Sequence, residues 1–144
     1  MNGKICMITG ASSGIGKTTA KGLAKLGATV VLVCRNKEKG NKTLEEIKSE
    51  TGNDKISLLI ADLSSQKSIR DLVDSFKTKY DKLDVLINNA GVIHNKRTLT
   101  EDGIATTFAV NHLAYFLLTN LLLDKLKAGS SSRIIIVASG LERR

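Results

Sequence analysis

Five short runs rich in β-branched and aliphatic residues alternate with segments of helical pattern along the 144-residue chain. The runs are nearly continuous in apolar residues, which is typical of strands buried on both faces of a parallel sheet. They are Lys4–Thr9, Thr29–Cys34, Ile56–Ala61, Leu83–Asn88 and Arg133–Ser139. Strand and helix alternating in this way, without a break in composition, predict one domain over residues 1–144 with a doubly wound α/β fold.

The segments between the runs carry three kinds of helix signal. Ser65–Tyr80 repeats apolar residues with the spacing of one helix face. Gly14–Leu26 and Lys37–Thr51 each end just before a glycine, the residue preferred after a helix C-terminus. Thr98-Leu99-Thr100-Glu101 has the spacing of a capping box, so we expect a helical region over residues 100–128.

Composition excludes several classes of protein. Apolar residues make up 42% and charged residues 25%, which excludes a disordered tail or a collagen-like chain. The net charge of +8 is spread along helical segments and aromatic residues are only 3%, so a nucleic-acid surface with stacking rings is not favoured. Leu113–Leu123 is too short to span a bilayer, and no signal peptide is seen. Cys6 and Cys34 form no metal-ligand spacing, so we expect no metal, reduced cysteines and a cytoplasmic location.

The turn Thr9-Gly10-Ala11-Ser12-Ser13-Gly14-Ile15-Gly16 joins the first strand to the first helix. A phosphate-binding turn belongs at this position, because the free N–H groups and the dipole at a helix N-terminus attract phosphate. Glycine is needed where the backbone turns tightly, approaches a pyrophosphate and packs helix against strand. The turn therefore predicts a nucleotide site in a Rossmann-type sheet.

The same turn allows a second interpretation. Ala11-Ser12-Ser13-Gly14-Ile15-Gly16-Lys17-Thr18 departs from the phosphate-binding loop of P-loop NTPases only at Ala11, where the strict pattern has glycine. Leu59-Ile60-Ala61-Asp62 resembles the apolar strand and aspartate that hold magnesium in such enzymes. A P-loop NTPase is therefore an alternative that the turn alone does not exclude.

The end of the second strand carries a cation where NAD-binding folds usually carry a carboxylate. Arg35 follows Cys34, and no acidic residue comes before Glu38. A carboxylate would hold the ribose 2′-hydroxyl of NAD and repel a 2′-phosphate, whereas a guanidinium can bind that phosphate through paired hydrogen bonds. Arg35 thus favours NADP(H) over NAD(H), with a solvated arginine at a strand end as the alternative.

Several motifs, taken in order, resemble those of the short-chain dehydrogenase/reductase family over essentially the whole chain. They are the glycine turn, Asp62-Leu63, Asn88-Asn89-Ala90-Gly91, Asn111 and the strand ending Val137-Ala138-Ser139. Cys34-Arg35-Asn36 and Asn111-His112-Leu113 look most like the retinol-dehydrogenase-like members. The resemblance implies NADP(H)-dependent interconversion of a small alcohol and its carbonyl, and it displaces the P-loop interpretation.

The resemblance also implies a role for each matching residue. The residues of the pyrophosphate turn would be Gly10, Ser12, Ser13, Gly14, Ile15 and Gly16. The other cofactor-binding residues would be Arg35 at the 2′-phosphate, Asp62 and Leu63 beside the adenine, and Asn88, Ala90 and Gly91 near the ribose. The catalytic residues would be Asn111 and Ser139, the latter bonded to the substrate carbonyl. The structural alternatives are a helix N-terminal charge for Asp62, a turn for Asn88, a helix bend for Asn111 and a strand-end cap for Ser139. His112 is interpreted as structural.

One part of the family pattern is not found in these 144 residues. The family's reaction needs a tyrosine and, four residues later, a lysine, whereas Tyr80 and Tyr115 are followed at that distance by Asp84 and Thr119. The resemblance therefore implies a truncated or inactive form, with a catalytically silent nucleotide-binding or interaction module as the alternative. In the strand order 3-2-1-4-5 without the family's later strands, Ile134–Val137 would form an open apolar edge, which predicts self-association.

Overall fold

The computed structural model describes residues 1–129 and 131–140. Within them, five parallel strands form one sheet in the order β3-β2-β1-β4-β5, which confirms the predicted fold class and strand order. The strands are β1 Ile5–Thr9, β2 Thr29–Cys34, β3 Ile56–Ile60, β4 Val85–Asn88 and β5 Arg133–Ile136. Each strand lies within the run predicted for it, and β2 agrees at both ends.

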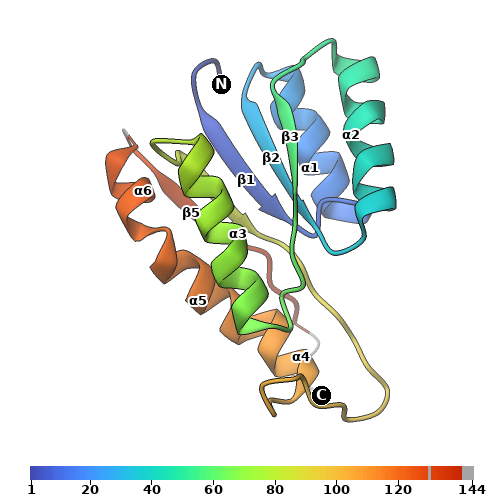
Figure 1. Ribbon diagram of the computed structural model, residues 1–144. Coiled ribbons are helices and arrows are strands. Elements are labelled where there is room, and N and C mark those ends of the chain that lie inside the picture. Colours follow the sequence, from blue (N-terminus) through green and yellow to red (C-terminus); the bar gives the residue numbers. More distant parts are fainter. Residues whose placement is uncertain (130, 141–144) are drawn as a thin grey trace.

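Helices cover both faces of the sheet (Figure 1). They are α1 Gly14–Lys25 and α2 Lys37–Thr51 on one face, and α3 Gln66–Lys79, α5 Ala114–Leu121 and α6 Leu123–Ala128 on the other. Side chains alternate along a strand, so Ile8 of β1 joins the apolar core beneath α1 and α2, while its neighbour Met7 joins the core beneath α3 and α5. These two cores hold the carboxyl ends of β1, β2 and β4 in place.

The predicted helical region over residues 100–128 is wrong at its start. Helix α4 begins only at Thr106 (Thr106–Phe108) and continues through a π-helical segment, η1 (Ala109–Leu113), into α5. Residues 100–104 instead form a turn, with Gly103 at φ +73° and its N–H donating to the Thr100 carbonyl at 3.0 Å. The acidic side chain of the expected capping box, Glu101, and that of the next residue, Asp102, bond to another helix. Glu101 accepts from the Ser65 hydroxyl, and Asp102 accepts from the Gln66 N–H at the N-terminus of α3.

The outer strand β5 forms an apolar edge of the described sheet. Ile134, Ile135 and Ile136 are 45%, 43% and 62% exposed, whereas the central strands β1 and β2 are almost wholly buried. The geometry of the predicted open edge is therefore present.

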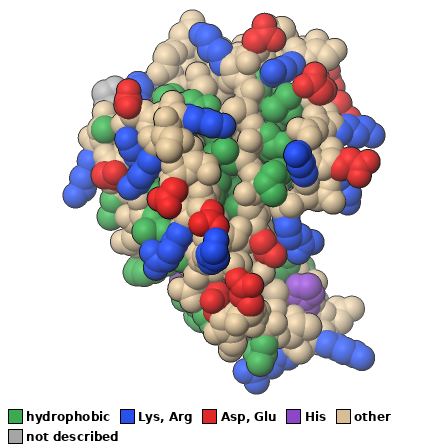
Figure 2. Space-filling model, in the orientation of Figure 1, with side chains coloured by type: hydrophobic (Ala, Val, Ile, Leu, Met, Phe, Trp, Pro, Cys, Tyr) green, Lys and Arg blue, Asp and Glu red, His purple; other side chains and the backbone are tan. Residues whose placement is uncertain are grey.

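Charge is mixed over the face shown in Figure 2, where Lys and Arg alternate with Asp and Glu and do not gather in one basic patch. Among the described residues, no helix is both long enough and apolar enough to cross a lipid bilayer.

Candidate nucleotide-binding site

A cleft of about 460 Å³ lies at the carboxyl ends of the central strands. Ten of the predicted cofactor-binding residues line it, namely Gly10, Ser12, Ser13, Gly14, Ile15, Arg35, Asp62, Leu63, Ala90 and Gly91. The sheet order reverses between β1 and β4, and open α/β sheets bind ligands in the crevice at such a switch point. The fold therefore brings together turns that are far apart in the sequence.

The glycines of the turn are required by three different local conditions. Gly10 has φ +66°, and a Cβ there would lie 2.8 Å from the Cα of Ala90. A Cβ on Gly16 would lie 2.5 Å from Nδ2 of Asn89 and would overlap the Gly10 carbonyl. Gly14 has φ +53° with no atom within 4 Å of its Cβ position, so its backbone is open to an approaching ligand.

Hydrogen bonds hold the turn from two sides. The Thr9 hydroxyl accepts from the main-chain N–H groups of Asn89 and Ala90, each at 3.0 Å. The Asn89 amide donates back to the Thr9 carbonyl at 3.0 Å. On the other side, the hydroxyl of Thr43 in α2 donates to the Ser12 carbonyl at 3.2 Å. The main-chain N–H groups at the start of α1 are thus fixed in place for binding an anion.

Arg35 supplies a cation at the β2 side of the cleft. It is exposed directly after the strand, and in the described part of the chain no ion pair engages its guanidinium. The next residue, Asn36, accepts from the Lys39 N–H at 2.8 Å and so begins α2. The guanidinium therefore keeps its donors for a ligand, and the residues present fit a phosphate-bearing dinucleotide.

The P-loop interpretation is not supported by the side chains that it needs. The Lys17 ammonium pairs with Glu46 of α2, and the Thr18 hydroxyl donates to the Gly14 carbonyl of its own helix at 3.1 Å. Neither residue lines the cleft. A P-loop would direct this lysine and hydroxyl to phosphate and magnesium.

Two of the predicted cofactor-binding side chains have structural partners. Oδ1 of Asp62 accepts from the N–H and the hydroxyl of Ser64, at 2.9 and 2.7 Å, and closes the loop after β3. Asn88 is fully buried and donates to the Thr119 hydroxyl at 3.1 Å, and its Oδ1 has no partner in the described structure. Asn88 and the buried Gly16 are the two predicted cofactor-binding residues that do not line the cleft.

The two predicted catalytic residues do not line the cleft. Asn111 lies in η1, where Oδ1 accepts from the Val92 N–H at 2.8 Å and Nδ2 donates to the Val92 carbonyl at 2.9 Å. Ser139 is exposed beyond the end of β5. His112 is also exposed and stacks on Phe108 with ring centroids 5.3 Å apart.

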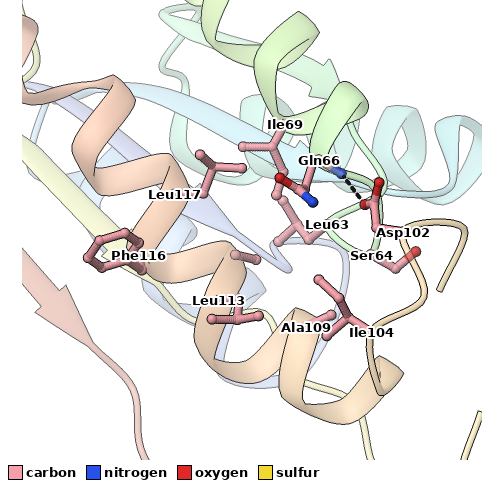
Figure 3. Close-up of a pocket in the computed structure, with 11 residues that line it drawn as sticks. Leu63, Ser64, Gln66, Ile69, Asp102, Ile104, Ala109, Leu113, Phe116 and Leu117 are labelled. Atoms are coloured by element: carbon pink, nitrogen blue, oxygen red, sulfur yellow. Dashed lines mark hydrogen bonds between the residues drawn. The ribbon is translucent and has the colours of Figure 1, made fainter. Parts of the chain in front are cut away.

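A second cavity, of about 220 Å³, lies between α3 and the α4–α5 region (Figure 3). Its lining is mainly apolar, with Ile69, Leu113 and Leu117 among its residues. The single acidic residue in the lining, Asp102, accepts the Gln66 N–H bond drawn in Figure 3. Because the lining contains neither lysine, arginine nor glycine, this cavity does not suit a diphosphate.

A doubly wound sheet, a glycine turn before a helix and a cleft at the switch point define a dinucleotide-binding α/β domain. Residues 4–143 match the family of short chain dehydrogenases. The chain is 47% identical to human "Retinol dehydrogenase 13" and 49% identical to human "Retinol dehydrogenase 11", in each case over 95% of this chain. It covers 41% and 43% of those two proteins, so it spans about two fifths of their length.

Solved structures agree with the sequence relatives. A putative short chain dehydrogenase from Escherichia coli CFT073, complexed with NADPH, superposes with a TM-score of 0.86 at 30% identity, over 100% of this chain and 62% of that one. The Pseudomonas aeruginosa RhlG/NADP active-site complex gives 0.84 at 30% identity, over 96% and 56%. The chain belongs to the short-chain dehydrogenase family.

Proposed function

We propose that this chain provides the NADP(H)-binding part of an oxidoreductase that interconverts a small alcohol and its carbonyl. One observation carries the proposal: the glycine turn at the start of α1 and the Arg35 guanidinium at the end of β2 line the same cleft. The NADP and NADPH complexes among similar structures support it. The retinol dehydrogenases among the relatives support an alcohol or carbonyl substrate.

Each wall of the cleft would hold one part of the coenzyme. The N–H groups at the start of α1 would bind the pyrophosphate, with Gly14 leaving room for its approach. Arg35 would bind the 2′-phosphate, and Asp62 and Leu63 would lie beside the adenine. The segment that follows β4 would lie beside the ribose. When bound, the coenzyme supplies or accepts the hydride.

The described tyrosines are both engaged in structural hydrogen bonds. The Tyr80 hydroxyl shares a 2.8 Å bond with Ser57, and the Tyr115 hydroxyl donates to the Ala90 carbonyl at 2.6 Å. General acid–base catalysis contributes about 10²–10⁴-fold to an enzyme's rate. We therefore expect the chain by itself to bind coenzyme with little turnover, with Ser139 contacting a substrate carbonyl and Asn111 shaping the segment at Val92.

Binding of NADPH, NADH and Mg-ATP to the purified chain tests the proposal. NADPH should bind most tightly. Arg35→Ala should lower the affinity for NADPH by about 10–100-fold, because hydrogen bonds to charged groups contribute about 1.5–3 kcal/mol. The affinity for NADH should change little. The matched control is Arg70→Ala, which removes an exposed arginine from α3.

The outcomes separate the alternatives. An equal loss for NADPH and NADH would remove the role of Arg35, and absence of binding to either would refute the proposal. Mg-dependent binding of ATP would revive the P-loop interpretation. Fusion of a segment that carries Tyr-x-x-x-Lys should restore carbonyl reduction, and tight binding without such rescue would favour a silent module.

A further inference from the structure

The segment after β4 is held against the glycine turn. Ala90 lies so close to Gly10 that a Cβ on this glycine would come within 3.2 Å of the Ala90 Cβ. The N–H of Ala90 donates to the Thr9 hydroxyl at 3.0 Å. Ala90 therefore forms the junction between the pyrophosphate turn and the β4 wall of the cleft.

The helical region formed by η1 and α5 also makes hydrogen bonds to the segment after β4, at two points. Tyr115 of α5 is 9% exposed, and its hydroxyl donates to the Ala90 carbonyl at 2.6 Å. Burial raises the pKa of this phenol, so it stays protonated and remains a donor. Four residues earlier, Asn111 makes its two bonds to the main chain of Val92. Gly91, which is exposed and lines the cleft, lies between the two fixed points.

The position of Gly91 indicates which part of the coenzyme it would meet. Arg35 follows β2, on one side of β1, whereas Gly91 follows β4 on the other side. A dinucleotide extends across the switch point, so its two halves lie on opposite sides of the central strand. With the 2′-phosphate at Arg35, the adenosine half lies toward β2 and the nicotinamide half lies toward β4.

We propose that Tyr115 is a positioning residue, whose hydroxyl, together with the Asn111 amide, fixes the main chain of Gly91 where it contacts the nicotinamide half of the coenzyme. The inference rests on the proposed NADP(H) function. Glycine has no side chain to restrict its backbone, so its place in the cleft depends on its neighbours. Without the Tyr115 hydroxyl, the Ala90 carbonyl loses the hydrogen-bond donor that the structure shows for it. The main chain at Gly91 is then held less firmly in the cleft.

The test compares two ligands in Tyr115→Phe. NADPH contacts both halves of the cleft, whereas adenosine 2′,5′-bisphosphate contacts only the adenosine half. The variant should bind NADPH about 3–10-fold more weakly, the range expected for one lost hydrogen bond. Its affinity for the bisphosphate should be unchanged. The matched control, Tyr80→Phe, also loses a hydroxyl bond, the one to Ser57, and should alter neither affinity.

A second measurement does not require a ligand. The Val92 N–H, which donates to Asn111, should exchange with solvent faster in Tyr115→Phe than in the wild type, with no change in Tyr80→Phe. Equal weakening of both ligands would mean a general loss of structure and would overturn the inference, as would unchanged NADPH affinity or unchanged exchange at Val92. If the wild type bound neither ligand, the proposed function would fall as well, and this outcome is distinct from the others.

Discussion

Two glycines of α1 provide a stringent test of how the cleft is built. Gly16 and Gly22 lie in the same helix, six residues apart. A Cβ on Gly16 would meet the Gly10 carbonyl and the Asn89 amide, whereas a Cβ on Gly22 would have no atom within 4 Å. Replacing each glycine by alanine adds the same methyl group to the same helix, so the difference between the variants isolates the contact with the turn.

The expected effects have opposite signs. Alanine in a helix interior is favoured over glycine by about 1 kcal/mol, so Gly22→Ala should raise the free energy of unfolding by about 0.4–1 kcal/mol. Overpacking costs about 1–3 kcal/mol, and at Gly16 one neighbour is a main-chain carbonyl that cannot rotate away. We expect Gly16→Ala to lower the free energy of unfolding by up to about 2 kcal/mol after the gain in helix propensity.

Binding should follow the same division. A shift of the Gly10 carbonyl moves the N–H groups of the turn, so Gly16→Ala should weaken the binding of NADPH. Each 1.4 kcal/mol of binding free energy lost in this way lowers the affinity about tenfold. Gly22→Ala should bind as the wild type does. Urea unfolding followed by circular dichroism and NADPH fluorescence titration measure the two effects. If Gly16→Ala matched Gly22→Ala in both assays, the close packing of the turn would be refuted.

Two further predictions concern pH and association. Burial of Asp84 opposes its ionisation, but the Ile5 N–H at 2.8 Å, Lys82 and Lys4 outweigh burial and hold the pKa of this carboxyl below its usual value. Its stabilisation is therefore present above about pH 4 and lost as the pH falls further, so Asp84→Asn should lose stability at neutral pH and flatten the acid side of the urea-unfolding profile. For the β5 edge, we expect the chain to self-associate and Ile135→Lys to reduce this in light scattering; a wild-type monomer would contradict it.

Short sequence patterns predicted correctly those helices whose ends are fixed by hydrogen bonds between residues close in the sequence. Helix α2 agrees at both ends with its predicted range, since Asn36 accepts from the Lys39 N–H at its start and Gly52, at φ +67°, follows its end. The capping-box pattern at residues 98–101 failed for the opposite reason. The Glu101 carboxylate bonds to Ser65, 36 residues away, and a pattern of four residues does not contain that contact.

Some residues of the candidate site could be predicted from the sequence and others could not. The cleft residues predicted from the glycine turn, from the end of the second strand and from the family resemblance came together because parallel strands bring their carboxyl ends to one edge of the sheet. Asn89 and Tyr115 were not predicted as site residues, although Asn89 belongs to a predicted motif. Their bonds to Thr9 and to Ala90 join residues 80 and 25 positions apart, so only the packing of β4 and α5 reveals them.

Coenzyme binding and proton transfer make different demands on this chain. The bonds that we find to fix the cleft come from Thr9, Thr43, Asn89, Asn111 and Tyr115, all within the described residues. These contacts hold main-chain atoms in place. One of them also engages the hydroxyl of Tyr115, which is one of the two tyrosines that could otherwise act as an acid. We therefore expect affinity for NADPH without turnover, because one bond that fixes the cleft engages the Tyr115 hydroxyl, and a bond to Ser57, away from the cleft, engages the Tyr80 hydroxyl.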